Sequence, residues 1–448
     1  MSTTTHATAT VVPRDPEDLI EFLDTSVRDP LYELAYHDGQ REGYVLARSP
    51  RVVAASLRRP AAAVTVAYRA YPGGTDEATI PFADLISVHR VELAPDRVEH
   101  GDPTDPAEMG RGLPRRVRRD CETVSIPAML AVLESPPADP LDRQQIVRAT
   151  KLLAENRPTD CRPAIPLLTD LLRAETVPQP CDALGAVAAL ADHDPLDVAP
   201  VIDRVTPYLT ADVPAAAQAA TRCVAEVAAA DPQSVLDTVP TLADTVATAA
   251  PGDRWAAWAL SKIARDHPGR VREVLPALRT VVADRDRDPD IVLHAVTALG
   301  RVFHETPGEG LPVVDTLAAL VEADHHKLRN NAIAALGEVA AIHGDVVADH
   351  VEVIAPHVEA ADEYGRINAT WVLARVAEDR PTAVRPYVPA LRRALDDETA
   401  AVRTNACLAL AAAGDIVARS LIDTLARTDP DPDVRRTAAR AAHRLEDA

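Results

Sequence analysis

One phrase recurs near the end of the chain and decides the fold: NAIAALGEVA at 331–340, NATWVLARVA at 368–377 and NACLALAAAG at 405–414. Each copy carries small or aliphatic residues at positions 0, +3, +4 and +7, counted from its first alanine. At about 100° of rotation per residue, these positions form one stripe along a helix. The phrase therefore predicts an amphipathic helix whose small residues allow a neighbouring helix to approach closely.

The same phrase extends back through the chain at a nearly constant spacing. Its first alanine falls at nine positions: Ala149, Ala183, Ala220, Ala256, Ala295, Ala332, Ala369, Ala406 and Ala438. Between copies lies a second apolar helix, usually marked by proline, as in VLPALRTVV at 274–282. We expect nine helix pairs, beginning at IPAMLAVLES (126–135) and ending with VRRTAARAAHRLEDA (434–448).

Two helices every ~37 residues resemble HEAT and armadillo repeats. The resemblance implies that the pairs stack into a superhelix, because no pair can bury its apolar face alone. It also implies that the phrase is the second helix of each pair, and that second helices line the concave surface. The expected fold is mainly α: a HEAT/armadillo-type α-solenoid over 123–448, preceded by a small α+β domain.

The first 122 residues lack the phrase and differ in composition. Residues 1–14 are rich in Thr and Ala and are predicted to be a disordered tail. Residues 15–100 are predicted to form the α+β domain, and 101–122 a basic linker. The elements expected in that domain are one helix and three strands, at 17–27, 62–71, 77–82 and 86–93.

Overall charge limits the classes of partner. The chain has 47 basic and 68 acidic residues and a net charge of −21, which argues against gripping nucleic acid or an anionic membrane through the whole surface. Only Lys151, Lys262 and Lys327 are lysines. This balance is similar to that of proteins from extreme halophiles, in which an acidic surface is an adaptation to the solvent.

Targeting and redox signals are weak. No uncharged apolar stretch reaches the ~18 residues of a membrane-spanning helix, and the first residues show no signal-peptide pattern. The five cysteines form no C-x-x-C pair. We expect reduced thiols in a cytoplasmic protein without membrane insertion.

Two tryptophans occupy outward positions of the repeated helix. On these helices positions +2 and +6 point away from the buried stripe, and Trp258 and Trp371 stand at +2. Tryptophan is enriched in binding hot spots, so both are candidate partner contacts. The alternative is that each ring packs on the next repeat.

A further resemblance concerns the same two helices. AAWALSKIAR (256–265) and NATWVLARVAEDRP (368–381) are similar to the third-helix phrase of armadillo repeats in importin-alpha-type proteins. The resemblance implies that the tryptophans stack on a partner peptide. Four residues after the tryptophan that family has Asn, whereas this chain has Lys262 and Arg375. These two cations replace the peptide-clamping amide as candidate contacts.

Two polar ladders accompany the later copies. Position −1 carries Asn331, Asn368 and Asn405, and position −3 carries Arg329, Arg366, Arg403 and Arg435. We expect the arginines to lie near the buried edge and to pair with acids of the neighbouring repeat. The asparagines are candidates either for bonds between repeats or for partner contacts.

Signatures of catalysis and metal binding are missing. The chain has no P-loop, no G-x-G-x-x-G after a strand, and no G-x-S-x-G. Its histidines cluster mildly over 294–357 without an H-E-x-x-H pair. Deoxyhypusine hydroxylase is a HEAT-repeat metalloenzyme that uses repeated His-Glu pairs. This chain has only one such pair, His304-Glu305, and we therefore reject that activity. We expect no catalytic residue, no cofactor and no metal.

A basic run precedes the solenoid in RGLPRRVRRD. Its arginines are Arg111, Arg115, Arg116, Arg118 and Arg119. They are predicted to serve as a linker or to dock on the acidic solenoid; nucleic acid and an acidic partner are the alternatives.

The function that these features favour is a non-enzymatic scaffold or adaptor that binds a partner protein along the concave face of the solenoid. An enzyme-associated or maturation factor of the HEAT lyase-like type is the alternative from a different class. Nucleic-acid binding through 111–119 is a third, which the acidic composition makes the weaker expectation. The sequence does not name the partner.

Overall fold

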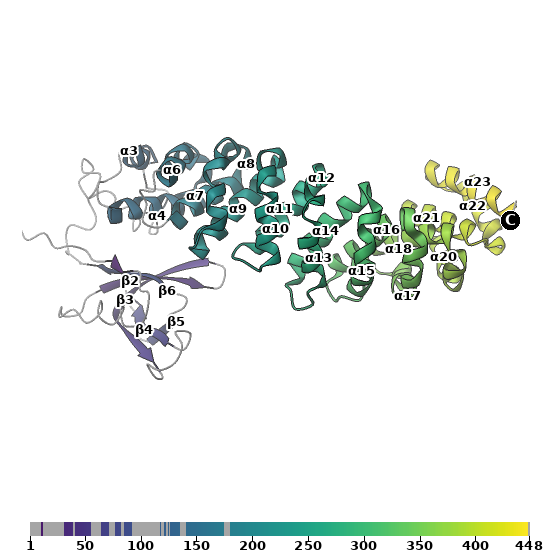
Figure 1. The fold of residues 1–448 in the computed structure, drawn as a ribbon, viewed down its shortest axis with the longest axis horizontal. Coiled ribbons are helices and arrows are strands. Elements are labelled where there is room, and N and C mark those ends of the chain that lie inside the picture. Colours follow the sequence, from purple (N-terminus) through teal and green to yellow (C-terminus); the bar gives the residue numbers. More distant parts are fainter. Residues whose placement is uncertain are drawn as a thin grey trace, which may run out of the picture. The chain divides into compact units, whose positions relative to one another are not determined.

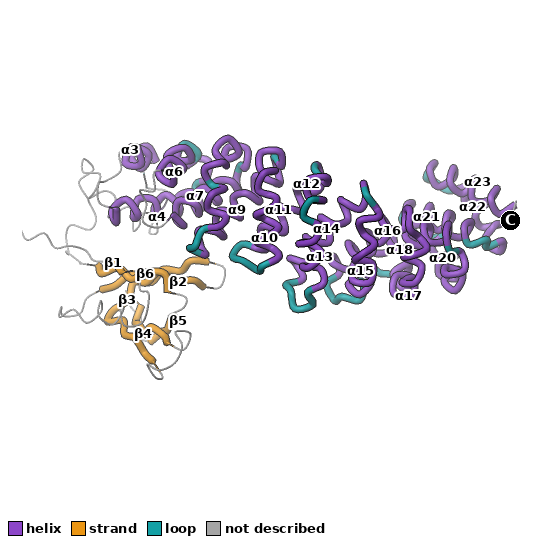
Figure 2. The backbone as a smooth tube through the Cα atoms, in the orientation of Figure 1, coloured by secondary structure: helices purple, strands orange, loops and turns teal. Residues whose placement is uncertain are grey.

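The computed structural model describes residues 10–11, 31–38, 41–54, 64–70, 77–81, 85–91, 117, 121, 124, 126–134, 140–173 and 180–446. Contacts divide the chain into two units, one of residues 1–113 and 137–142 and the other of 114–136 and 143–448. The first unit contains a β-sheet, and the second contains stacked helices (Figures 1 and 2). The predicted helix at 17–27 lies outside the described residues.

The sheet has six described strands in the order β1-β6-β2-β3-β4-β5, with every neighbouring pair antiparallel. The strands are β1 (Thr10–Val11), β2 (Leu31–Asp38), β3 (Arg41–Ala54), β4 (Val64–Ala70), β5 (Glu77–Pro81) and β6 (Leu85–Val91). Strands β4, β5 and β6 confirm the three predicted strands. Strand β1 pairs with β6 inside the segment expected to be a tail.

Strands β2 and β3 were not predicted, although local chemistry explains them. Asp38 pairs with Arg41, and only Gly39-Gln40 separates them in the sequence, which is the spacing of a two-residue hairpin. The register between β3 and β4 shifts between Arg48 and Arg51. Pro50 lies in that interval and has no N–H for the ladder, so a bulge forms there.

The second unit consists of helix pairs, and within the described residues nine second helices can be followed. They are α4 (Pro140–Asn156), α7 (Pro180–His193), α9 (Pro214–Ala230), α11 (Asp253–Asp266), α14 (Pro289–Glu305), α16 (His326–Val347), α18 (Glu363–Asp379), α21 (Ala400–Ala412) and α23 (Pro432–Glu446). From α7 onward each second helix packs against the next one (Figure 1). The expected nine pairs and the α-solenoid are thus confirmed.

The first helix of most pairs is broken into short α and 3₁₀ segments. These segments are α3 (Ile126–Glu134), α5 (Pro158–Cys161), α6 (Ala164–Arg173), α8 (Pro195–Val198), η4 (Ala199–Arg204), η5 (Thr206–Thr210), η6 (Pro232–Thr238), α10 (Val239–Ala247), α12 (Pro268–Arg272), α13 (Leu275–Ala283), η7 (Pro307–Val313), α15 (Val314–Leu320), η8 (Ala348–His350), α17 (Val351–Ile354), η9 (Ala355–Glu359), α19 (Pro381–Val384), η10 (Arg385–Tyr387), α20 (Val388–Ala394), η11 (Ile416–Ala418) and α22 (Arg419–Thr428). Proline explains many of the breaks, because it cannot donate the backbone hydrogen bond that continues a helix.

Burial confirms the predicted stripe. All nine first alanines of the phrase are fully buried. Position +4 is Leu or Val in eight copies, and each of these eight side chains is 0% exposed. Small residues at position 0 let adjacent second helices approach, and branched residues at +4 fill the space between layers.

Proline also sets the turn from each second helix to the next pair. At six turns the residue before the proline is non-helical, with φ between −133° and −145° and ψ between 55° and 95°. The proline ring excludes the helical conformation at that residue, which ends the helix. Gly344 stands where the proline is missing, and its N–H donates to Oδ2 of Asp379 at 2.9 Å. There the two helices merge across a kink at His343.

This merged run, 326–359, is the one stretch among the described helices that is long and apolar enough to cross a membrane. In an 18-residue window of it, 56% of the residues are buried within the protein. Helix α16 packs between α14 and α18. The run therefore packs as a core element of the solenoid.

Candidate functional site

The outward positions of the second helices form a continuous surface, which we call the second-helix face. It consists of the +2 and +6 residues of the phrase: Lys151, Gly185, Arg222, Trp258, Thr297, Ala334, Trp371, Leu408 and Arg440 at +2, and Glu155, Ala189, Glu226, Lys262, Arg301, Glu338, Arg375, Ala412 and Arg444 at +6. All eighteen are exposed or half-buried. Helical periodicity alone therefore assigned the inside and the outside of these helices correctly.

Four side chains form a row in the order cation, ring, ring, cation; three of them belong to this face, and Trp255 lies beside it at position −1. The rings of Trp255 and Trp258 meet edge to face, with centroids 5.9 Å apart. Lys262 Nζ lies 5.2 Å from the Trp258 centroid, and the guanidinium carbon of Arg222 lies 5.4 Å from that of Trp255. We call these four residues the Trp255–Trp258 cluster. Each cation holds a ring in place through a cation–π contact.

The sequence predicted half of this cluster. Trp258 and Lys262 were candidates, and the structure brings them together one helical turn apart. Trp255 and Arg222 were missed. Trp255 occupies position −1, where three later repeats carry Asn, and Arg222 stands at the +2 position of the preceding repeat. Aligning the repeats by position would have placed both residues next to the predicted candidates, and this alignment was the signal that could have identified them.

Trp371 is half-buried and packs on the preceding repeat. A Cβ atom added to Gly337 of α16 would stand only 2.2 Å from Cζ3 of the Trp371 ring. The absence of a side chain at Gly337 thus creates the seat for this tryptophan. Arg375, one turn further along α18, is exposed, and it makes no hydrogen bond or ion pair with any described residue.

The three asparagines bond to the preceding second helix. Asn331 Nδ2 donates to Oγ1 of Thr297 at 2.8 Å. Asn368 Nδ2 donates to the carbonyl of Asn330 at 3.0 Å, and Asn405 Nδ2 donates to the carbonyl of Ile367 at 3.3 Å. These side chains therefore tie neighbouring repeats together. A contact between the asparagines and a partner stays a prediction.

The arginine ladder is confirmed as structural for two of its members. Arg366 Nε donates to Asp397 of the next repeat at 2.7 Å. Arg403 binds Asp429 with both Nε and Nη2, each at 2.8 Å. Arg329 lacks the corresponding acid, because Ala360 occupies the position that Asp397 has relative to Arg366.

Two acidic groups of the second-helix face have neighbours that affect their charge. Glu338 Oε2 lies 3.0 Å from Nδ1 of His304. Burial, together with the nearby Asp192 carboxylate, raises the pKa of Glu226 and so disfavours its charged form. Arg301 is exposed and, like Arg375, makes no hydrogen bond or ion pair with the described residues. The middle of the face thus presents two arginines without an ion-pair partner among the described residues, one of which, Arg301, lies near Asp266.

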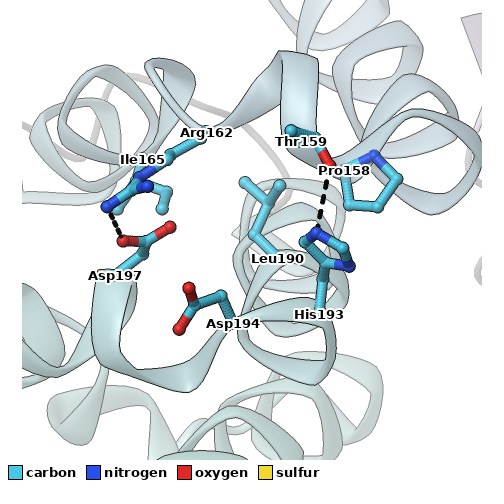
Figure 3. Close-up of a pocket in the computed structure, with 8 residues that line it drawn as sticks. All are labelled: Pro158, Thr159, Arg162, Ile165, Leu190, His193, Asp194 and Asp197. Atoms are coloured by element: carbon cyan, nitrogen blue, oxygen red, sulfur yellow. Dashed lines mark hydrogen bonds and ion pairs between the residues drawn. The ribbon is translucent and has the colours of Figure 1, made fainter.

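A small hollow lies away from this face, where α5 and α6 meet α7 and α8 (Figure 3). Its volume is about 170 Å³. Its polar groups are paired with each other: Arg162 forms an ion pair with Asp197, and Thr159 lies 3.1 Å from His193. Asp194 accepts from the backbone N–H of Leu196 and so caps α8. The hollow therefore lies at a turn between repeats, and the polar side chains named here already have hydrogen-bond or ion-pair partners.

Other chemistry-bearing residues are dispersed. Among the described residues, no group of three or more His, Cys, Asp or Glu could hold a metal ion. All five cysteines are free, and Cys161, Cys223 and Cys407 are buried. The basic run Arg111–Arg119 lies outside the described residues.

Comparisons with known proteins agree with this architecture. Residues 351–443 match the family model of HEAT repeats. No curated protein matches the chain. The solenoid is a HEAT/armadillo-type fold, in agreement with two solved structures whose TM-scores exceed 0.5.

An engineered protein is similar over 77% of this chain and 96% of its own, with 18% identity and a TM-score of 0.66. A structure from a study of the phosphorylation switch between cadherin and β-catenin is similar over 79% of this chain and 82% of its own, with 14% identity and a TM-score of 0.64. A designed armadillo repeat protein in complex with the peptide (KR)4 covers 48% of this chain and 99% of its own, with 17% identity and a TM-score of 0.43. At these identities the likeness to the first two structures concerns the fold alone.

Proposed function

We propose that this HEAT/armadillo-type solenoid is a non-enzymatic scaffold that binds a segment of a partner protein along its second-helix face. The observation that carries the proposal is the Trp255–Trp258 cluster, in which two half-buried indoles, Trp258 on that face and Trp255 beside it, lie next to two cations. Rigid aromatic rings flanked by cations are typical binding hot spots, because they lose little conformational entropy on binding.

Trp371 and Arg375 provide a second contact point. Trp371 is held on Gly337 and is therefore already ordered before a partner arrives. A pre-ordered side chain contributes affinity without an ordering cost. Leu408, 39% exposed, occupies the +2 position of the next repeat and extends the apolar surface.

The fold supports a binding role by analogy. The similar structure from the cadherin and β-catenin study belongs to work on an interaction between two proteins. Because fold does not fix function, this analogy only raises the expectation of a protein partner. The contacts of this chain must carry the proposal.

We further propose a cytoplasmic location. None of the five cysteines forms a disulfide, and three of them are buried. Secreted domains of this composition usually pair their cysteines, whereas reducing compartments keep thiols free.

The test is partner capture with matched baits. The full chain and a Trp258→Ala/Trp371→Ala variant would be compared as baits in a lysate of the source organism, with folding of both confirmed by circular dichroism. A Thr382→Ala/Pro389→Ala variant, changed at exposed first-helix positions, is the control. Loss of a partner from the tryptophan variant alone supports the proposal. Equal capture by all three baits contradicts it.

A further inference from the structure

The second-helix face differs in charge from the rest of the protein. Its eighteen positions carry seven basic and three acidic side chains, a net charge of +4, in a chain whose net charge is −21. Three of the seven cations form ion pairs with acids outside these positions, so the remaining four carry the charge that a partner meets. The three pairs are Lys151 with Asp182, Arg222 with Asp192 and Arg444 with Glu378. A local charge opposite to that of the whole molecule selects partners by electrostatic complementarity.

Half of this net charge lies between α11 and α18, and the other half lies on α23, where Arg444 is paired with Glu378. Lys262, Arg301 and Arg375 occupy the +6 positions of α11, α14 and α18. The intervening acid, Glu338, is engaged by His304 at 3.0 Å. The guanidinium groups of Arg301 and Arg375 form no ion pair or hydrogen bond within the described part of the chain, although Arg301 lies near enough to Asp266 to contribute to the lowered pKa of that carboxyl group. Both guanidinium groups can therefore bind a carboxylate from a partner.

Apolar anchors stand at both ends of this stretch. Trp258 marks one end, on α11, and Trp371 marks the other, on α18. Three steps between adjacent second helices separate them. At about 8–10 Å per step, the anchors lie ~24–30 Å apart along the stack. An extended peptide rises ~3.3 Å per residue, so about seven to nine residues span the distance.

We propose that the segment taken by the second-helix face is an extended acidic peptide, with two apolar residues about seven to nine positions apart and carboxylates between them. This inference rests on the proposed function and names the chemistry of the partner. Arg301 and Arg375 bind the carboxylates, while the two tryptophans receive the apolar residues.

Charge density favours a peptide over nucleic acid. Duplex DNA carries one negative charge per ~1.7 Å, or roughly 14–18 charges over this stretch. The face offers only Lys262, Arg301 and Arg375 there, and the carboxylate of Glu338 stands among them. A few carboxylates, spaced about three residues apart to match the helix spacing, fit this arrangement better than a continuous row of phosphates.

The test uses synthetic peptides and fluorescence anisotropy with the full chain. Each labelled peptide carries two phenylalanines separated by a spacer of about eight residues, made from Ser with Glu, or from Ser with Gln as the neutral probe. A second acidic peptide has a spacer of about three residues. We expect the long acidic peptide to bind about tenfold tighter than either of the other two.

Charge-reversal variants locate the site. Arg301→Glu/Arg375→Glu should abolish the preference for Glu over Gln, whereas Arg385→Glu/Arg427→Glu should keep it. The control arginines are exposed on the first-helix layer and make the same change in total charge. Circular dichroism confirms that both variants are folded.

Each alternative result overturns the inference in a recognisable way. If the neutral peptide binds as tightly as the acidic one and Trp258→Ala weakens both, the acidic partner is wrong while the proposed function stands. Failure of every peptide also overturns the inference, and the capture experiment then decides the proposed function separately. Binding of a duplex DNA probe that is tighter than peptide binding and lost in Arg301→Glu/Arg375→Glu would assign the face to nucleic acid.

Discussion

Trp371 lies directly on Gly337 of the preceding repeat, where an added Cβ would stand 2.2 Å from the indole ring. We predict that Gly337→Ala forces the ring to move and lowers the free energy of unfolding by about 1–3 kcal/mol, the usual effect of overpacking. Denaturant titration followed by circular dichroism measures the change.

Gly300→Ala is the matched control for this prediction. It is also a glycine within a second helix, but its added Cβ would lie 3.7 Å from Ala335, an ordinary contact. Alanine is the better helix former by up to about 1 kcal/mol, so this variant should be as stable as the parent or more stable. Equal stability of the two variants would contradict the packing of Trp371 on Gly337.

The buried Arg403–Asp429 pair should be a major link between the last two repeats. Its two hydrogen bonds are both 2.8 Å, and its side chains are 10% and 1% exposed. Asp429→Asn leaves a buried guanidinium without its counter-charge, which should cost about 3–5 kcal/mol. Thermal unfolding measures the loss. The exposed Arg393–Glu359 pair is the control, and Glu359→Gln should hardly shift the midpoint.

The same carboxylate should make stability depend on pH in acid. The hydrogen bonds from Arg403 hold the pKa of Asp429 below its ordinary value. A carboxyl group with a lowered folded-state pKa stabilises the protein above its unfolded pKa of about 3.9, and this contribution disappears as the pH falls through the folded value. Unfolding midpoints between about pH 6 and pH 2 should therefore fall less steeply in Asp429→Asn than in the parent. Identical slopes would show that the carboxylate is not paired in solution.

The thiols provide a test of the core. Burial raises the pKa of Cys161 to about 11 and those of Cys223 and Cys407 to about 12. Thiolates are the reactive form, so these three should resist alkylation at neutral pH in the folded protein. Mass spectrometry after iodoacetamide treatment should find label on Cys121 and Cys181 at most. Labelling of Cys223 without denaturant would be incompatible with the packing of α9.

Periodicity accounts for what could be predicted from the sequence. The nine alanines at position 0 repeat a local rule, and local rules determine which face of a helix is buried. Strands β2 and β3 were missed because Asp38-Gly39 and Pro50 interrupt the alternation that marks a strand. Their pairing depends on a hairpin and a bulge, which pattern counting does not find.

For the site, contacts within a helix were predictable and contacts between repeats were not. Lys262 lies four residues after Trp258, so their contact follows from helix geometry. The contact of Arg222 with Trp255 and the seat of Trp371 on Gly337 depend on how far one repeat is staggered against the next. That stagger arises from packing between layers, which a single helical phrase does not encode.

The central claim is that a partner lies on the second helices, and site-specific photocrosslinking tests it most directly. A photoreactive phenylalanine would replace Ala334 on α16 in one bait and Ala319 on α15 in the other, two alanines of one helix pair on different layers. After capture and irradiation, we predict a partner crosslinked through position 334 and none through position 319. Crosslinking through position 319 alone would contradict the account.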